Sequence, residues 1–290
     1  MLDWLKAPLA QKLPIGEQIE QATDFVTTHF AGTFDAISAT LGRLIDGLTD
    51  ALLWVDPFVF IAAFALIGAV LRRNISVPVM IVLGLLLIWN LGYWEATVET
   101  LALVLCATGL CLLIGVPLGI MAAHRPWLYP LLRPVLDLMQ TIPPFVYLIP
   151  TLILFGRGVV PGLISTAVFA VAAPIRLTHL GITSVPKQLL EAGEAFGATP
   201  MQRLWKIELP HAMPSIMAGI TQCIMLSLSM VVIAALVGAG GLGKPVVRAL
   251  NSVNIAQGFE AGLCIVIVAI LLDRLFRYRA PQDIAASANT

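Results

Sequence analysis

The chain contains seven apolar stretches that approach the length of a membrane-spanning helix, and they limit the possible folds more than any other feature. A helix needs about 20 mostly apolar residues to cross the hydrocarbon core of a bilayer. Only 12% of the 290 residues are charged, whereas soluble domains carry about 25%. The sequence therefore predicts an all-α integral membrane protein, a polytopic bundle with about seven transmembrane helices. The stretches lie at 51–71, 77–94, 97–122, 128–156, 160–180, 214–238 and 258–276.

Two of these stretches are irregular. The first is interrupted by Asp56 and Pro57, which leaves its start open. The fourth is rich in proline, and each proline removes one backbone donor from a helix. We therefore expect the fourth stretch to be kinked or partly re-entrant. Its prolines are Pro130, Pro134, Pro143, Pro144 and Pro150.

Residues 1–50 show a different pattern, that of an amphipathic helix. Apolar residues recur at alternating steps of four and three, which places them on one helix face. Charged residues such as Asp35 and Arg43 fall off that face. Such a helix can lie flat in the headgroup layer or pack against its own bundle, and the sequence leaves both open. The apolar positions are Phe30, Phe34, Ile37, Leu41, Leu44 and Leu48.

The distribution of Lys and Arg predicts the orientation, because cytoplasmic loops carry an excess of these residues. With the N-terminus outside, the segments 72–76, 123–134, 181–213 and 274–290 face the cytoplasm and carry ten Lys or Arg residues. The outside segments carry six. We therefore predict an extracytoplasmic N-terminus and a cytoplasmic C-terminus.

The segment 184–213 is too polar for lipid, yet it is strongly patterned. Pro186 can open a helix that ends at Gly197, and Thr199 can cap a second helix that stops before Pro210. The result is a short helix–turn–helix pair in a predicted cytoplasmic loop. Its apolar face, with charges beside it, suits contact with another protein.

This loop resembles the EAA loop of permeases of ATP-binding cassette (ABC) importers. That family's pattern is Glu-Ala-Ala, three residues, Gly, nine residues, Ile, one residue and Leu-Pro. The spacing matches throughout, and the one departure is a glycine at the third position, which is usually alanine. The matching residues are Glu191, Ala192, Gly193, Gly197, Ile207, Leu209 and Pro210.

The segments 140–150 and 226–243 extend the resemblance to the permeases for quaternary amines, namely glycine betaine, proline betaine and choline. The likeness covers about residues 55–277. It implies a type I importer permease core at 95–280 with a coupling loop at 184–213. Around that core we expect two accessory transmembrane helices at 51–94, an N-terminal interfacial segment at 1–50 and a cytoplasmic tail at 281–290.

The resemblance also implies a function and a set of partners. The chain is expected to be a non-catalytic subunit that carries choline or glycine betaine across a bacterial cytoplasmic (inner) membrane. Two copies would pair with two ATPase subunits and with a periplasmic or lipid-anchored substrate-binding protein. ATP and magnesium belong to the ATPase in this family, so we expect no cofactor on this chain. A net charge of zero gives no indication of a nucleic-acid partner.

Polar side chains inside the apolar stretches are candidates for a translocation path, because such groups are costly in lipid. Interhelical hydrogen bonding is the alternative role. Tyr147 could add a cation–π surface for a quaternary amine. Arg176 is expected to reach the headgroups or to pair with an acidic neighbour. The candidates are Asp137, Gln140, Thr141 and Tyr147 on the fourth stretch, with Gln222, Ser227 and Ser229 on the sixth.

Several other signals do not support a site. The glycine-rich segment 238–244 nearly fits a phosphate loop, but Pro245 stands where a hydroxyl is needed. We expect a flexible or tightly packed turn there. The four cysteines lie in apolar runs, and the histidines lack metal-site spacing, so we expect no metal.

An ATP-independent secondary transporter is the alternative function, but it predicts inverted repeats, and the sequence contains no convincing one.

Overall fold

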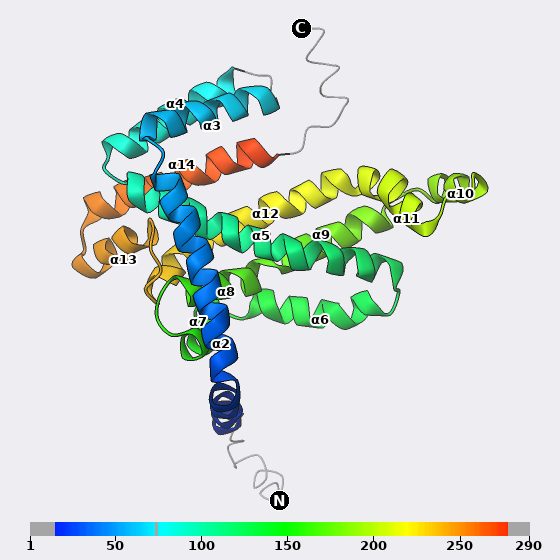
Figure 1. Ribbon diagram of the computed structural model, residues 1–290, viewed down its shortest axis with the longest axis horizontal. Helices are drawn as coiled ribbons and strands as arrows, with labels where there is room; N and C mark the ends of the chain where they lie inside the picture. Colours follow the sequence, from blue (N-terminus) through cyan, green and yellow to red (C-terminus); the bar gives the residue numbers. More distant parts are fainter. Residues whose placement is uncertain (1–14, 73–74, 278–290) are drawn as a thin grey trace, which may run out of the picture.

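The computed structural model describes residues 15–72 and 75–277, and every element in these ranges is a helix (Figure 1). The predicted all-α fold is thus confirmed, while the predicted tail 281–290 lies outside the described residues. The helices are α2 (Ile15–Leu53), α3 (Pro57–Arg72), α4 (Ser76–Asn90), α5 (Trp94–His124), α6 (Leu128–Thr141), α7 (Pro144–Phe155), α8 (Val159–Ala170), α9 (Ala172–Thr183), α10 (Lys187–Ala195), α11 (Pro200–Arg203), a π-helical turn (Leu204–Glu208), α12 (Leu209–Ala235), α13 (Gly243–Ser252) and α14 (Ile255–Phe276).

The helices account for the predicted spans. Within the described residues, four segments are each long and apolar enough to cross a membrane: Trp94–His124, Val159–Thr183, Pro200–Ala235 and Ile255–Phe276. The other three predicted stretches correspond to α3, to the shorter apolar helix α4, and to the bent pair formed by α6 and α7.

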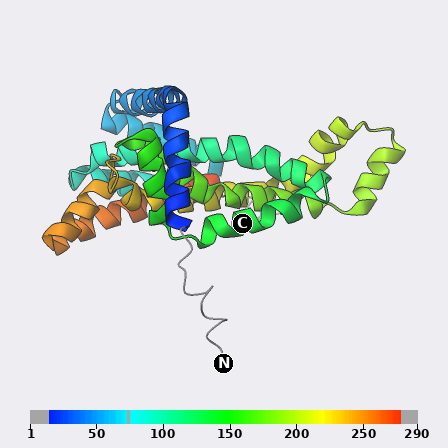
Figure 2. The same ribbon diagram turned by 90° about the horizontal axis from the view of Figure 1, so that it is seen from below.

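Helix α2 lies across the spans rather than along them. Its axis makes an angle of 98° with α3, and Figures 1 and 2 show it crossing the bundle. The chain turns at Asp56, whose Oδ1 accepts the backbone N–H of Phe58 at 2.9 Å and caps α3. Residues 51–55, predicted to begin the first span, belong instead to the end of α2 and to this turn.

Only part of the apolar stripe of α2 contacts the bundle. Leu41 packs against a buried cluster that includes Ile45 of the same helix, and the ring of Phe34 packs edge-on against Phe155 of α7 with centroids 5.4 Å apart. Other members of the stripe stay outside this contact. The predicted amphipathic helix is therefore present, with one part of its stripe packed and another part open. The open positions are Phe30, Ile37 and Leu44.

Close packing of α9 against α5 and α12 holds the centre of the bundle together. A Cβ added at Gly119 of α5 would lie 2.7 Å from Thr178 Cβ and 2.8 Å from Ile175 O. A Cβ at Gly219 of α12 would lie 3.3 Å from Pro174 Cα. Small residues at these points let the backbones approach, which is how helices associate in a membrane.

The fourth predicted span is broken. Helices α6 and α7 meet at 97°, with Ile142 extended between them and Pro144 at the start of α7. The Tyr147 hydroxyl donates to the carbonyl oxygen of Met139 at 2.8 Å and ties α7 back to α6. The expectation of a kinked or re-entrant segment is confirmed.

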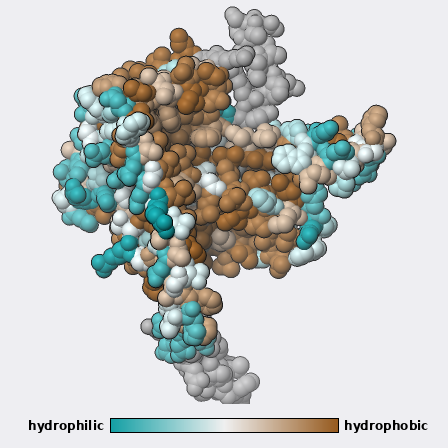
Figure 3. Space-filling model, in the orientation of Figure 1, coloured by the Kyte–Doolittle hydropathy of each residue, from teal (hydrophilic) through white to brown (hydrophobic). Residues whose placement is uncertain are grey.

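Hydrophobic side chains cover the middle of the molecule, as expected for a bundle surrounded by lipid. Hydrophilic residues gather at the end where α13 lies and around α10 and α11 at the opposite end (Figure 3). Helix α12 runs from the second end to the first, and α14 runs back in the opposite direction (Figure 1). The polar ends and the apolar middle define the two sides of the protein.

Candidate functional site: the helical arm and the polar groups of the spans

Residues 187–208, here called the helical arm, project from the bundle at one end (Figure 1). Helix α10 ends at Gly197, whose φ of +75° is left-handed and favours glycine. The N–H of Gly197 donates to Glu194 O at 2.9 Å, and the N–H of Ala198 donates to Gly193 O at 3.0 Å. This is a Schellman ending, and it confirms the predicted role of Gly197 in stopping the first helix.

Helix α11 begins as the sequence predicts. The Thr199 hydroxyl accepts the N–H of Gln202 at 3.3 Å, and the Gln202 side chain accepts the N–H of Thr199 at 2.9 Å. Pro200 occupies the first turn. This reciprocal capping box satisfies two donors that a helix start leaves free, so the turn between α10 and α11 is defined on both sides.

The second helix of the arm does not stop before Pro210, so that part of the prediction is wrong. The chain continues through the π-helical turn into α12, and Pro210 lies in the first turn of α12. A proline ring clashes with the carbonyl four residues earlier in an α-helix. Here the N–H of Leu209 bonds to Leu204 O, five residues back. The wider π turn therefore accommodates the proline within an unbroken helix.

The two halves of the family-like motif touch each other at Gly193. This residue is buried, and a Cβ added there would lie 2.5 Å from Ile207 Cδ1. The one departure from the family pattern thus lies where the two halves of the motif make contact. Glu191 stands nearby on the exposed surface of α10.

The far end of the arm presents large apolar side chains to its surroundings. Phe196 is 92% exposed, and Met201 and Trp205 are each 64% exposed. Leu189 on α10 is 46% exposed. Exposed apolar side chains gathered at a polar end of the molecule suit contact with another protein.

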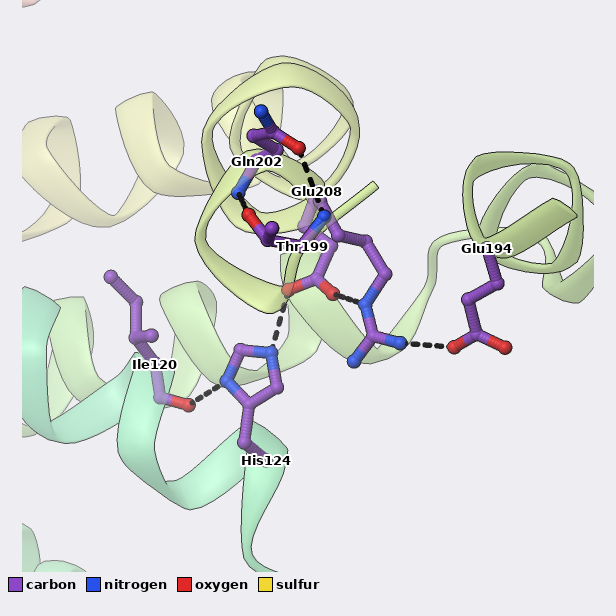
Figure 4. A network of polar contacts seen from close by, with 7 residues as sticks. Ile120, His124, Glu194, Thr199, Gln202 and Glu208 are labelled. Carbon is purple, nitrogen blue, oxygen red and sulfur yellow. Dashed lines mark hydrogen bonds and ion pairs between the residues drawn. The ribbon is translucent and has the colours of Figure 1, made fainter. Parts of the chain in front are cut away.

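A buried carboxylate fastens the arm to α5 (Figure 4). The Glu208 side chain is 4% exposed. Its Oε2 lies 2.7 Å from His124 Nε2, and its Oε1 accepts from Arg203 Nε at 3.0 Å. The Arg203 Nη1 group also pairs with Glu194 of α10. One chain of polar contacts therefore links α10, α11, the π turn and the end of α5.

The sequence did not predict this network. His124 and Glu208 are 84 positions apart, so no local pattern joins them. The available signal was the place of Glu208 between the apolar motif residues Ile207 and Leu209.

Of the polar candidates on α6, one forms an ion pair with another helix and two are exposed. Asp137 Oδ1 accepts from Arg176 Nη2 of α9 at 2.7 Å, which confirms that Arg176 pairs with an acidic neighbour. Arg133 Nε lies 4.0 Å from the same carboxylate. Gln140 and Thr141 are exposed at the end of α6. Asp137 therefore joins α6 to α9 and remains half exposed.

The candidates on α7 and α12 are not brought into one cluster. Tyr147 is partly buried and engaged with Met139. Ser227 is 1% exposed and lies within the packed bundle. Gln222 and Ser229 are exposed on α12, seven residues apart and thus on one face. In one copy of the chain, most of these polar groups point away from the packed core.

The glycine-rich segment 238–244 forms a tightly packed turn. Of the two predicted alternatives, a flexible turn and a tightly packed one, the second is therefore confirmed. The Leu242 N–H donates to Thr100 Oγ1 at 2.8 Å, and the Gly241 N–H donates to Glu99. A Cβ added at Gly243 would lie 2.3 Å from Val231 O. Backbone donors that a phosphate loop would present to a nucleotide are here used within the protein.

Comparison with known proteins agrees with this architecture. Residues 115–281 match the family described as "Binding-protein-dependent transport system inner membrane component". The glycine betaine transport system permease protein OpuAB of Bacillus subtilis is 44% identical over 91% of this chain and 93% of its own length. The glycine betaine/proline betaine transport system permease protein ProW of Escherichia coli is 43% identical over 91% of this chain and 74% of its own length.

Solved structures of the MetNI methionine ABC transporter have the same fold over most of the chain. One inward-facing form aligns with a TM-score of 0.56 and 25% identity, covering 66% of this chain and 93% of the other. A second form gives a TM-score of 0.58. This chain belongs to the family of binding-protein-dependent transport system inner membrane components, as a non-catalytic, membrane-spanning permease subunit of an ABC importer.

Proposed function

We propose that this permease imports a quaternary amine, with glycine betaine or choline as the substrate. The observation that carries the proposal is the agreement among three relatives that are 43–44% identical over 91–92% of this chain and are named for glycine betaine transport. A more distant relative, 36% identical over 78% of the chain, is named for trimethylamine N-oxide. These names share a small polar solute with a methylated nitrogen. Nothing in them favours an ATP-independent transporter.

The helical arm is proposed as the coupling element that docks on the ATPase. Support comes from its exposed apolar end, where Phe196 and Trp205 stand clear of the bundle, and from its rigid construction around Gly197 and Thr199. A rigid arm with an apolar end can transmit a movement of its partner to α12, with which it is continuous. ATP and magnesium are assigned to the partner subunit, so this chain needs no cofactor.

A second copy of the chain is proposed to complete the translocation path. Gln222 and Ser229 on α12 are exposed in the single chain, as are Gln140 and Thr141 on α6. Polar groups in membrane spans face protein or a water-filled cavity rather than lipid. A homodimer with two ATPase subunits and one external binding protein would enclose these groups and give them a role.

The arm side is proposed to face the cytoplasm, which places the C-terminus there and the N-terminus outside. Helix α2 would then lie in the outer headgroup layer. Its angle of 98° to α3 and its exposed apolar positions Phe30, Ile37 and Leu44 support a helix that rests on the bundle and dips into lipid.

The proposal is tested by uptake into vesicles that hold this chain with its own ATPase and binding protein. Labelled glycine betaine and labelled choline are supplied separately, with and without internal ATP. ATP-dependent accumulation of either, reduced by an excess of the other, is the expected result. Uptake of neither compound would refute the substrate assignment, and uptake without ATP would refute the role of the ATPase. A vesicle lacking the binding protein is the matched control.

A further inference from the structure

The helical arm has a second connection to the membrane spans besides its continuity with α12. Glu208 stands at the base of the arm, and its carboxylate meets His124 at the last position of α5. Helix α5 packs against α9, which lies between α5 and α12 at the centre of the bundle. A displacement of the arm can thus reach the spans by two routes, through the α12 backbone and through this side-chain contact.

Each oxygen of the Glu208 carboxylate in this contact has its own partner. Glu208 is 3% exposed, and burying a carboxylate is costly unless it is paired and hydrogen-bonded. Arg203 Nε supplies one partner at 3.0 Å and His124 Nε2 supplies the other at 2.7 Å. The Nδ1 atom of His124 lies 3.0 Å from Ile120 O, which can only accept. Both ring nitrogens therefore face acceptors, so the ring donates twice when it is an imidazolium.

The two carboxylates that contact Arg203 differ in their exposure to solvent, and this difference shows which contact holds the arm in place. Glu194 on α10 is 60% exposed, whereas the Glu208 side chain is 4% exposed. An exposed pair contributes little, while the loss of one partner of a buried pair leaves an uncompensated charge. The contacts of His124 and Arg203 with the buried Glu208 carboxylate are thus the part that holds the arm to α5.

We propose that Glu208 and His124 are positioning residues that transmit movement of the arm to α5, so that ATP hydrolysis moves α5 and α12 together. This inference rests on the proposed coupling role of the arm. It assigns a function to Glu208, which lies between two residues of the EAA-like motif but is not one of the motif residues. The contact does not touch substrate and takes no part in binding ATP.

The test separates transport from ATP hydrolysis in the assembled transporter. Glu208→Gln and His124→Ala are each reconstituted with the ATPase and binding protein, and transport is measured per ATP hydrolysed. We expect each variant to co-purify with the ATPase and to hydrolyse ATP, while transport per ATP falls at least about fivefold, the lower end of typical coupling between sites. The double variant is expected to lose no more than either single variant, because both remove one contact.

Two further variants make the result specific. His124→Lys places a cation opposite Glu208 and is expected to recover much of the transport per ATP. His29→Gln is the matched control, because His29 Nδ1 also contacts the carbonyl four residues earlier, Phe25 O at 2.9 Å, but lies far along the chain on α2. It is expected to leave the ratio unchanged.

The possible failures are distinguishable. An unchanged transport-to-ATP ratio in Glu208→Gln would overturn the positioning role while leaving the coupling arm intact. Loss of ATPase co-purification in Glu208→Gln but not in His124→Ala would make Glu208 a docking residue instead. If the unaltered chain failed to co-purify with the ATPase, the proposed coupling role itself would fall.

Discussion

Gly193 lies directly against Ile207, and a Cβ placed on the glycine would stand 2.5 Å from the Ile207 Cδ1 atom. The two residues belong to opposite halves of the arm, so this contact sets the distance between α10 and the π turn. The neighbouring atom is the far end of a flexible side chain, which can move.

Gly193→Ala is therefore expected to change little. Alanine favours the helical state by about 1 kcal/mol over glycine, and this gain offsets the displacement of Ile207. Transport should stay within about twofold of the unaltered chain. Gly193→Leu cannot be accommodated in the same way and should lower both ATPase co-purification and transport. Equal behaviour of the two variants in the same uptake assay would show that α10 does not pack on Ile207.

Replacement of Gly197 tests the turn of the arm. Its φ of +75° costs a non-glycine residue about 1–2 kcal/mol, and asparagine tolerates it better than alanine. We expect ATPase co-purification to decrease in the order Gly, Asn, Ala, with Gly197→Pro and Glu191→Lys abolishing transport. All four variants should insert normally in the membrane. Full transport by Gly197→Pro would contradict the coupling role.

Close packing between α5 and α9 gives a prediction about stability. Gly119→Ala places a methyl group 2.8 Å from Ile175 O, which is backbone and cannot move aside. Overpacking of this kind costs about 1–3 kcal/mol, so the melting temperature in detergent should fall by several degrees. Gly109→Ala is the matched control. Gly109 lies on the same helix, but a Cβ added there would meet no atom of a neighbouring element within 4 Å. A similar fall in both variants would place the effect elsewhere.

The Asp137–Arg176 pair separates an interhelical tie from a substrate contact. Asp137→Ala should lower transport whichever role holds. The charge-swapped double variant Asp137→Arg with Arg176→Asp should recover part of the loss if the pair joins α6 to α9. Recovery is expected to be incomplete, because Arg133 lies 4.0 Å from the carboxylate that would be replaced. No recovery at all, with normal insertion and ATPase co-purification, would favour direct contact between Asp137 and the cationic substrate.

Much of this fold was predictable because lipid leaves few alternatives. Apolar length located the spans, apart from the start of the first, and the five prolines of the fourth stretch predicted the break that lies between α6 and α7. Local chemistry at Gly197 and Thr199 predicted both boundaries of the turn in the arm. These features depend on neighbouring residues in the sequence, which is why a single chain reveals them.

The rest depends on contacts between distant segments. The α12 helix runs on past Pro210 because a π turn relieves the clash, and nothing in the sequence marks a π turn in advance. The short helix α13 lies outside the predicted apolar stretches, since it has only ten residues and a strongly polar side. The pairing of Glu208 with His124 depends on how α5 meets the arm, which only the folded bundle defines.

The π turn at residues 204–208 also sets the direction in which the arm points. A π turn holds one more residue than an α turn, and each residue of an α-helix advances the chain by about 100° around its axis. Removing a single residue there would turn the arm by roughly a quarter of a revolution relative to the spans. The direction in which the exposed apolar side chains of the arm face is thus set by one additional residue at the start of α12.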